Sequence, residues 1–231
     1  MQLPPLIEAC LLRRYKRFLA DVELEDGTVM TVHCPNSGSM RGCVGQGWPV
    51  MLSTSDNPNR KYPHTLEMVH NGACWIGINT QRANPVVEEA IRGGLIDELH
   101  DFDELHREVR LGETSRIDFA MQSGDRRTWI EVKNVTLLEA HGRYAFPDAN
   151  TSRGAKHLRE LTAAVATGDR AVMLYLIQRS DGEGFTVADD IDPTYGEELR
   201  RAMVNGVEVL AYRAEVNPEE IRVAERIPVE L

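Results

Sequence analysis

The feature that most constrains this chain is a pair of short apolar segments, 116–122 and 128–135, that carry charged side chains. Both are rich in β-branched and aromatic residues, and a polar, glycine-containing stretch separates them, so they predict a β-hairpin. Side chains alternate between the faces of a strand, which puts Glu131 and Lys133 on one face. Asp118, in the first strand, can point to the same side. We therefore expect two carboxylates and an amine to meet on one face of an otherwise apolar sheet.

This arrangement suits a divalent cation. Neighbouring carboxylates in a poorly solvated site repel each other, and Mg²⁺ is commonly held by one or two carboxylates together with water. Asp118 and Glu131 are therefore candidate metal ligands, and Lys133 could orient an attacking water or stabilise negative charge. The alternative is an exposed hairpin with a weak ion pair. On spacing alone that is the commoner case, because Glu-x-Lys occurs in many strands.

The order of these residues resembles a known arrangement. Asp118 in one strand, with Glu131-Val132-Lys133 in the next, is similar to the core of the PD-(D/E)XK nuclease superfamily, with Ile117 in the place of the proline. The whole chain resembles the sugar fermentation stimulation protein A (SfsA) family. Three strings carry that resemblance: His33-Cys34-Pro35-Asn36-Ser37-Gly38-Ser39-Met40, Phe146-Pro147-Asp148-Ala149 and Arg153-Gly154-Ala155-Lys156-His157-Leu158. The resemblance implies a DNA-binding protein with a nuclease-like domain.

The first third of the chain reads as a small β-barrel. Five short strands are predicted within about 80 residues, punctuated by Gly and Pro, and this pattern is typical of a closed barrel. They lie at 18–24, 28–33, 48–53, 64–69 and 75–78. The family resemblance implies that the barrel is an OB-fold. We place the boundary between Gly77 and Asn84, which divides the chain into an OB-like domain, 1–80, and a second domain, 81–231.

The second domain alternates strands and helices, which predicts an α/β layer structure with a mixed sheet. Helices are expected at 85–92, 151–166 and 193–204, and strands near 108–111, 171–178 and 207–213. Asn84 is expected to cap the first helix, with Pro85 at its first position, and Thr151 to cap the second. The resemblance implies a restriction-endonuclease-like fold. Nuclease-like folds often supply a further acidic ligand from a helix, and Glu88 is the candidate.

The net charge of −10 argues against a nucleic-acid partner only if the charge is evenly spread. Residues 1–81 are neutral, whereas residues 126–159 hold seven basic against three acidic side chains. Two basic groups are candidate nucleic-acid contacts: Arg13, Arg14, Lys16 and Arg17, interleaved with aromatic rings, and Arg153, Lys156 and His157 on one face of the predicted helix 151–166. Each group could instead be an ordinary solvated surface.

Composition bounds the protein class. A hydrophobic fraction of 42% and a charged fraction of 27% are typical of a soluble globular protein. The apolar runs are too short to span a bilayer, and the N-terminus lacks the order of a signal peptide, so we expect a cytoplasmic protein without a membrane partner. The four cysteines form no C-x-x-C pair and are expected to be free thiols. A homodimer is left open.

Together these observations favour a Mg²⁺- or Mn²⁺-dependent nuclease that acts on DNA. Asp118 and Glu131 would hold the metal with Glu88, and Lys133 would position the attacking water. The alternative is a DNA-binding regulator of sugar metabolism genes whose nuclease fold is not catalytic. The clustered carboxylates favour the enzyme, because phosphate repulsion would penalise them in a protein that only binds DNA.

Overall fold

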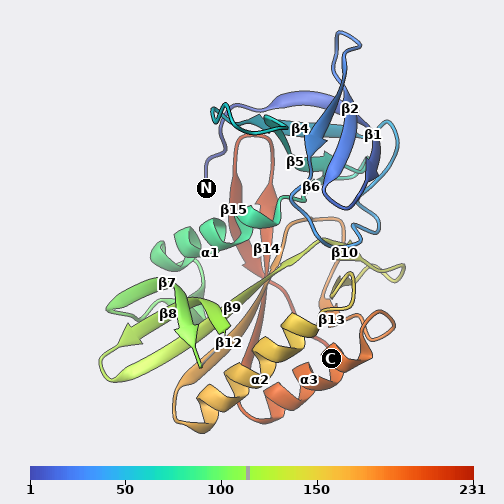
Figure 1. Cartoon of the computed structure of the whole chain (residues 1–231). Helices are drawn as coiled ribbons and strands as arrows, with labels where there is room; N and C mark the ends of the chain where they lie inside the picture. Colours follow the sequence, from blue (N-terminus) through green and yellow to red (C-terminus); the bar gives the residue numbers. More distant parts are fainter. Residues whose placement is uncertain (113–114) are drawn as a thin grey trace.

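The computed structural model describes residues 1–112 and 115–231, and its N-terminal domain is a closed barrel (Figure 1). The barrel strands are β1 (Ile7–Tyr15), β2 (Leu19–Glu23), β3 (Val29–His33), β4 (Pro49–Thr54) and β5 (His64–His70). They pair in the order β3-β2-β1-β4-β5, and a parallel contact between His33 and Thr65 joins β3 to β5. The closed sheet surrounds a core that includes Leu11, Val22 and Leu52.

The barrel confirms the expected architecture but differs in two of its strands. Residues 7–15 form β1, for which no strand was predicted, because only Ala9 and Leu11 turn into the core and a bulge after Leu11 interrupts the alternation. The last predicted strand, 75–78, is not part of the closure. It forms the short β6 (Trp75–Gly77), which pairs antiparallel with the C-terminal end of β5.

The second domain is organised around one mixed sheet of strand order β15-β14-β12-β9-β8-β7. Its strands are β7 (Glu104–Leu111), β8 (Ser115–Ser123), β9 (Arg126–Val135), β12 (Arg170–Ile177), β14 (Glu208–Val216) and β15 (Ile221–Arg226). The central strands β9, β12 and β14 run parallel, and the outer ones are antiparallel. A smaller sheet joins β10 (Leu137–Leu138), β11 (Tyr144–Phe146) and β13 (Phe185–Val187).

Helices cover both faces of the mixed sheet, as the predicted α/β layers require (Figure 1). On one face α1 (Ala83–Arg92) packs Val86 and Val87 against Ile130 and Val132 of β9. On the other face lie α2 (Ser152–Ala166) and α3 (Pro193–Val204). Consequently β12 is buried along almost its whole length. Within the described ranges, no helix combines the length and apolar character needed to cross a membrane.

The helix starts show where local sequence signals hold and where they fail. Thr151 caps α2 as expected, because its side chain accepts a hydrogen bond from Gly154 N. The expectation that Asn84 caps the first helix is wrong. A 3₁₀ turn, Thr80–Arg82, is capped by Asn79 and leads directly into α1, which places Asn84 inside the helix. Its side chain is thereby free to reach across to Asp118.

A buried arginine couples the two domains. Arg179 follows β12, and its side chain is 3% exposed. It donates to the carbonyl of Thr136 at 2.6 Å and to both oxygens of Asp181 at 2.7 Å. Asn71, from the barrel, donates to the same carboxylate at 2.7 Å. Burial alone would raise the pKa of Asp181, but the hydrogen bonds from Arg179 and Asn71 outweigh it and lower the pKa to about 2.

We predict that Asp181→Asn lowers the free energy of unfolding by about 3 kcal/mol, because it leaves a buried guanidinium without its counter-charge. A carboxyl whose pKa falls on folding stabilises the protein above its unfolded pKa of about 4, and this contribution is lost as the pH drops toward 2. The difference between the two proteins should therefore be full at pH 6 and shrink below about pH 4. Urea unfolding followed by tryptophan fluorescence measures it.

The matched control is Glu215→Gln, which removes one partner of the exposed pair with Arg222. It should change stability by less than about 1 kcal/mol. Equal effects of the two substitutions would show that Asp181 does not stabilise the domain contact.

Candidate active site between the two domains

The predicted hairpin is present as β8 and β9, joined by a turn at Gly124 and Asp125. Phe119 pairs with Ile130, and from that pair the strands run together to the turn. Asp118 lies just beyond the last pair. Its Oδ2 accepts from Val132 N at 2.8 Å, and its Oδ1 accepts from Asn84 Nδ2 at 2.7 Å. One backbone and one side-chain donor therefore fix the orientation of this carboxylate.

Glu131 is a buried carboxylate with all its hydrogen bonds on one oxygen. Its Oε1 is bonded to Lys133 Nζ at 2.5 Å and to His157 Nδ1 on α2. Its Oε2 has no partner among the described residues, although the residue is 3% exposed. Burial alone would raise the pKa of Glu131, but the charge of Lys133 and the hydrogen bond from His157 outweigh it and lower the pKa. The site thus holds an ionised carboxylate with a free oxygen, which is what a cation requires.

The second carboxylate behaves in the opposite way. The pKa of Asp118 is raised to about 6, first by burial and then by the negative charge of Glu131. The hydrogen bonds from Val132 and Asn84 only partly offset this rise. The two carboxylates are therefore close enough to repel each other. A cation between them would relieve the repulsion.

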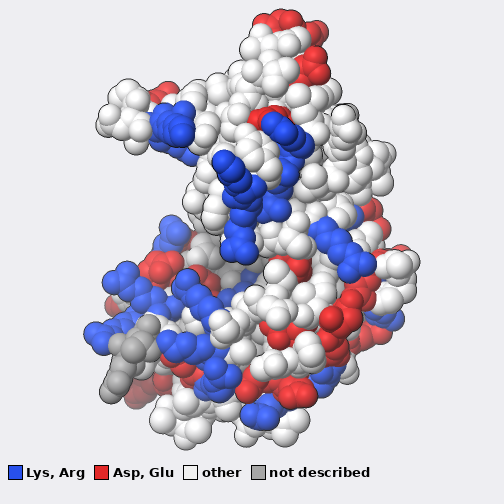
Figure 2. All heavy atoms as spheres, turned by 45° about the vertical axis from the view of Figure 1, so that its right-hand side comes forward, with Lys and Arg blue, Asp and Glu red and all other residues white. Residues whose placement is uncertain are grey.

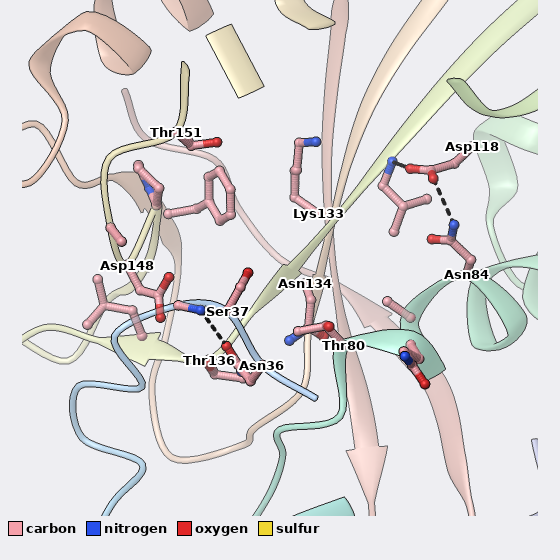
Figure 3. A pocket seen from close by; sticks show the side chains of 18 of the residues that line it. Asn36, Ser37, Thr80, Asn84, Asp118, Lys133, Asn134, Thr136, Asp148 and Thr151 are labelled. Carbon is pink, nitrogen blue, oxygen red and sulfur yellow. Dashed lines mark hydrogen bonds between the residues drawn. The ribbon is translucent and has the colours of Figure 1, made fainter. Parts of the chain in front are cut away.

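Asp118 and Lys133 line a cleft of about 600 Å³ to which both domains contribute, whereas the buried Glu131 is bonded to Lys133 and is not among the residues that line it. Figure 3 shows Lys133 in the cleft, with Asp118 and Asn84 on one side and Asp148 and Ser37 on the other. Ser37 belongs to the loop that follows β3 of the barrel, whereas the other four belong to the second domain. The volume is in the range of ligand pockets, about 300–1,000 Å³.

Two family models match the chain, one to each domain. The model described as the SfsA N-terminal OB domain matches residues 12–78, and the model described as the sugar fermentation stimulation protein RE domain matches residues 81–220. The chain belongs to the SfsA family. The expected OB-fold and restriction-endonuclease-like domain are thereby confirmed.

Relatives of similar length support this membership. Sugar fermentation stimulation protein homologs are 56% identical over 229 residues in Pelobacter propionicus, covering 99% of both chains, and 54% identical over 232 residues in Geotalea uraniireducens, covering 100% of both. Among solved structures, that of Pyrococcus furiosus SfsA in complex with Ca²⁺ has a TM-score of 0.89 and 25% sequence identity. The match covers 100% of this chain and 98% of that one.

The third predicted metal ligand, Glu88, is not part of the SfsA site in this chain. Its carboxylate pairs with Arg92 at 3.0 Å and with Arg107 at 3.4 Å. This corrects the expectation. No group of three or more His, Cys, Asp or Glu side chains in the described ranges is arranged to hold a metal. A cation here would therefore use Asp118 and Glu131 together with water, a ligand set that Mg²⁺ accepts.

The four basic residues predicted to contact nucleic acid from the barrel have different environments in the structure. Arg13 pairs with Asp21 at 2.8 Å, and Arg14 is committed to backbone carbonyls, among them Arg17 O at 2.7 Å. The expectation that Arg14 contacts nucleic acid is therefore corrected to a structural role. Lys16 and Arg17 form the turn between β1 and β2 with positive φ angles of 48° and 64°, and Arg17 lines the cleft.

The three residues predicted to contact nucleic acid from α2 also have different environments. His157 is 3% exposed and points at Glu131, so the expectation that it binds nucleic acid is wrong. The spacing that placed it on the basic face did not reveal that this edge of the helix packs on β9. Arg153 is exposed, and its Nε lies 3.4 Å from His157 Nε2. Lys156 lies 3.7 Å from Glu160. That Arg153 and Lys156 contact nucleic acid stays a prediction.

Several polar residues that line the cleft were not predicted, among them Asn84 and Asp148. Asn84 was interpreted as a helix cap, and Asp148 was noted only as part of a family string. Neither has a local signal for its position, because both reach the cleft from segments far from the hairpin in sequence. Asp148 accepts a hydrogen bond from Met40 N at 3.1 Å and so ties the second domain to the barrel.

We predict that Asp118→Asn strongly weakens Mn²⁺ binding at pH 7, measured by calorimetry. In the unsubstituted protein the affinity should fall roughly tenfold per pH unit below about pH 6, because the cation competes with the proton on Asp118. Glu88→Gln is the matched control and should bind as the unsubstituted protein does. Equal binding by the Asp118→Asn variant would remove this residue from the site.

Proposed function

We propose that this SfsA protein is a divalent-metal-dependent nuclease that hydrolyses phosphodiester bonds in DNA. The observation that carries the proposal is Glu131, whose buried, ionised carboxylate is close to Asp118 and Lys133 and has an Oε2 without a partner in the described chain. The Pyrococcus furiosus relative was solved with Ca²⁺, which supports a divalent cation in the family. We propose Mg²⁺ or Mn²⁺ as the working ion and the cytoplasm as the compartment, since DNA is found there.

The residues of the site divide the work between holding a cation and handling charge. Asp118 and Glu131 would hold the cation, each oriented by two hydrogen bonds. When bound, a divalent cation supplies Lewis acidity and makes water a better nucleophile at neutral pH. His157 and Lys133 keep Glu131 ionised by binding one of its oxygens, and the other oxygen has no partner in the described chain.

Lys133 contributes a second function because its amine lies at the cleft, with a side chain 14% exposed. An ammonium has three donors, and only one is bonded to Glu131. The remaining donors can orient water toward the phosphorus atom and stabilise the charge that develops on the phosphate oxygens. Such a preorganised donor is worth more in a poorly solvated cleft than in water.

The second candidate is a non-catalytic DNA-binding regulator of sugar metabolism genes on the same fold. The cleft argues against it, because two clustered carboxylates facing a phosphate backbone would weaken binding unless a cation neutralises them. Cleavage assays with Mg²⁺ and Mn²⁺ on single-stranded, duplex and branched DNA decide between the two. Absence of cleavage on every substrate would favour the regulator.

We predict that Lys133→Ala lowers the hydrolysis rate by about two to three orders of magnitude, the usual effect of removing one electrostatic donor. DNA affinity should fall only by about one phosphate contact. Single-turnover cleavage and equilibrium binding separate the two effects.

Lys133→Arg distinguishes a chemical role from simple charge pairing. A planar guanidinium can keep the ion pair with Glu131 but cannot take the place of a compact ammonium in the cleft, so it should not restore the rate. If the alanine variant cleaves normally, Lys133 serves only as the partner of Glu131.

A further inference from the structure

One wall of the cleft is a barrel loop, residues 35–40, that is held from several directions. The Nη2 atom of Arg14 donates to Asn36 O and Gly38 O, each at 2.9 Å. Asn36 Nδ2 donates to Ile78 O at 3.1 Å, inside the linker between the domains. The loop is therefore bonded to β1 and to the linker, and it is not a free lid.

The second domain holds the same loop from the other side. Asp148 accepts from Met40 N, and Gly38 packs directly on the Asp148 carboxylate, so that a Cβ atom on Gly38 would overlap it. From the linker between the domains, Thr80 Oγ1 donates to Pro35 O at 2.9 Å. Because residues of both domains bind it, the loop 35–40 is fixed beside Asp118 and Lys133.

A second cavity, of about 470 Å³, lies on the barrel next to the cleft, and Gln81 lines both cavities. It covers the seam between β3 and β5, where Arg60 Nη2 donates to Thr65 Oγ1 at 3.1 Å and lies 3.4 Å from His33 Nδ1. In the described chain no carboxylate pairs with Arg60, whereas Arg82 in the same cavity is neutralised by two bonds to Glu67.

Arg60 is therefore a cation held in place by neutral groups. Burial and the charge of Arg60 both lower the pKa of His33, so its ring is neutral at pH 7. Figure 2 shows a hollow between the upper and lower parts of one face, with Lys and Arg side chains on both sides of it. A guanidinium that lines a cavity and has no carboxylate partner in the described chain suits a phosphate.

We infer that one unpaired DNA strand runs from the cleft across the β3–β5 seam of the barrel, where Arg60 binds one of its phosphates. The inference rests on the proposed function and adds its substrate class: single strands, or the unpaired parts of branched DNA. A groove that carries cations along its length is how OB-folds bind unpaired strands. Arg17, which lines the cleft from the β1–β2 turn, provides a second cation along the same strand.

The test measures binding by fluorescence anisotropy in EDTA, so that nothing is hydrolysed. The probes are a labelled oligothymidylate of about 16 nucleotides, the upper end of OB-domain site sizes, and a duplex of the same length. The single strand should bind more tightly than the duplex at equal salt. Arg60→Gln should weaken single-strand binding roughly tenfold, the effect of one hydrogen bond to a charged group, and lower its salt slope by about 0.7.

The charge-matched control is Arg159→Gln, on α2 and away from the barrel (Figure 1). It should leave both quantities unchanged. Equal effects of the two substitutions, or a duplex bound as tightly as the single strand, would overturn the inference. A separate cleavage assay distinguishes failure of this inference from failure of the proposed nuclease function. Cleavage within an intact duplex overturns the single-strand track and leaves the nuclease standing, whereas tight single-strand binding without cleavage refutes the nuclease and leaves the track standing.

Discussion

The site depends on the interaction of Glu131 with Lys133 and His157. An ionised carboxylate that is 3% exposed is strongly disfavoured unless partners stabilise it. Here a lysine two residues along the same strand and a histidine from the covering helix both bind one oxygen. The other oxygen is thereby left without a partner in the described chain, next to Asp118. The same two contacts that make the buried charge tolerable also prepare it to bind a cation.

This interaction explains the layout of the second domain. β9 supplies Glu131 and Lys133 from its middle, which requires the strand to be buried on both faces and covered by α2. At the open end of the hairpin, Asp118 lies where β8 and β9 separate. Asn84 of α1 donates a hydrogen bond to its carboxylate. Each carboxylate is therefore positioned by a different helix on a different face of the sheet.

Much of this arrangement could be predicted from the sequence, because the signals are local. The hairpin, its acidic residues and Lys133 follow from alternation within one strand pair, and the α/β layers follow from segment periodicity. The misplaced residues fail for a common reason. His157, Glu88 and Arg14 have spacings typical of exposed faces, but each has a partner that lies 26, 19 and 22 residues away in sequence, respectively. The periodicity of a single segment cannot reveal contacts with residues so far away in sequence.

The contact between Gly38 and Asp148 bears on how the two domains relate as modules. A barrel that merely tethered DNA could be exchanged or deleted without altering the chemistry of its neighbour. Here the barrel supplies a wall of the cleft, and Gly38 lies so close to the Asp148 carboxylate that no side chain would fit between them. Each domain therefore forms part of the cleft, and neither forms it alone. A hybrid assembled from two distant relatives would need this glycine and its acidic neighbour inherited together.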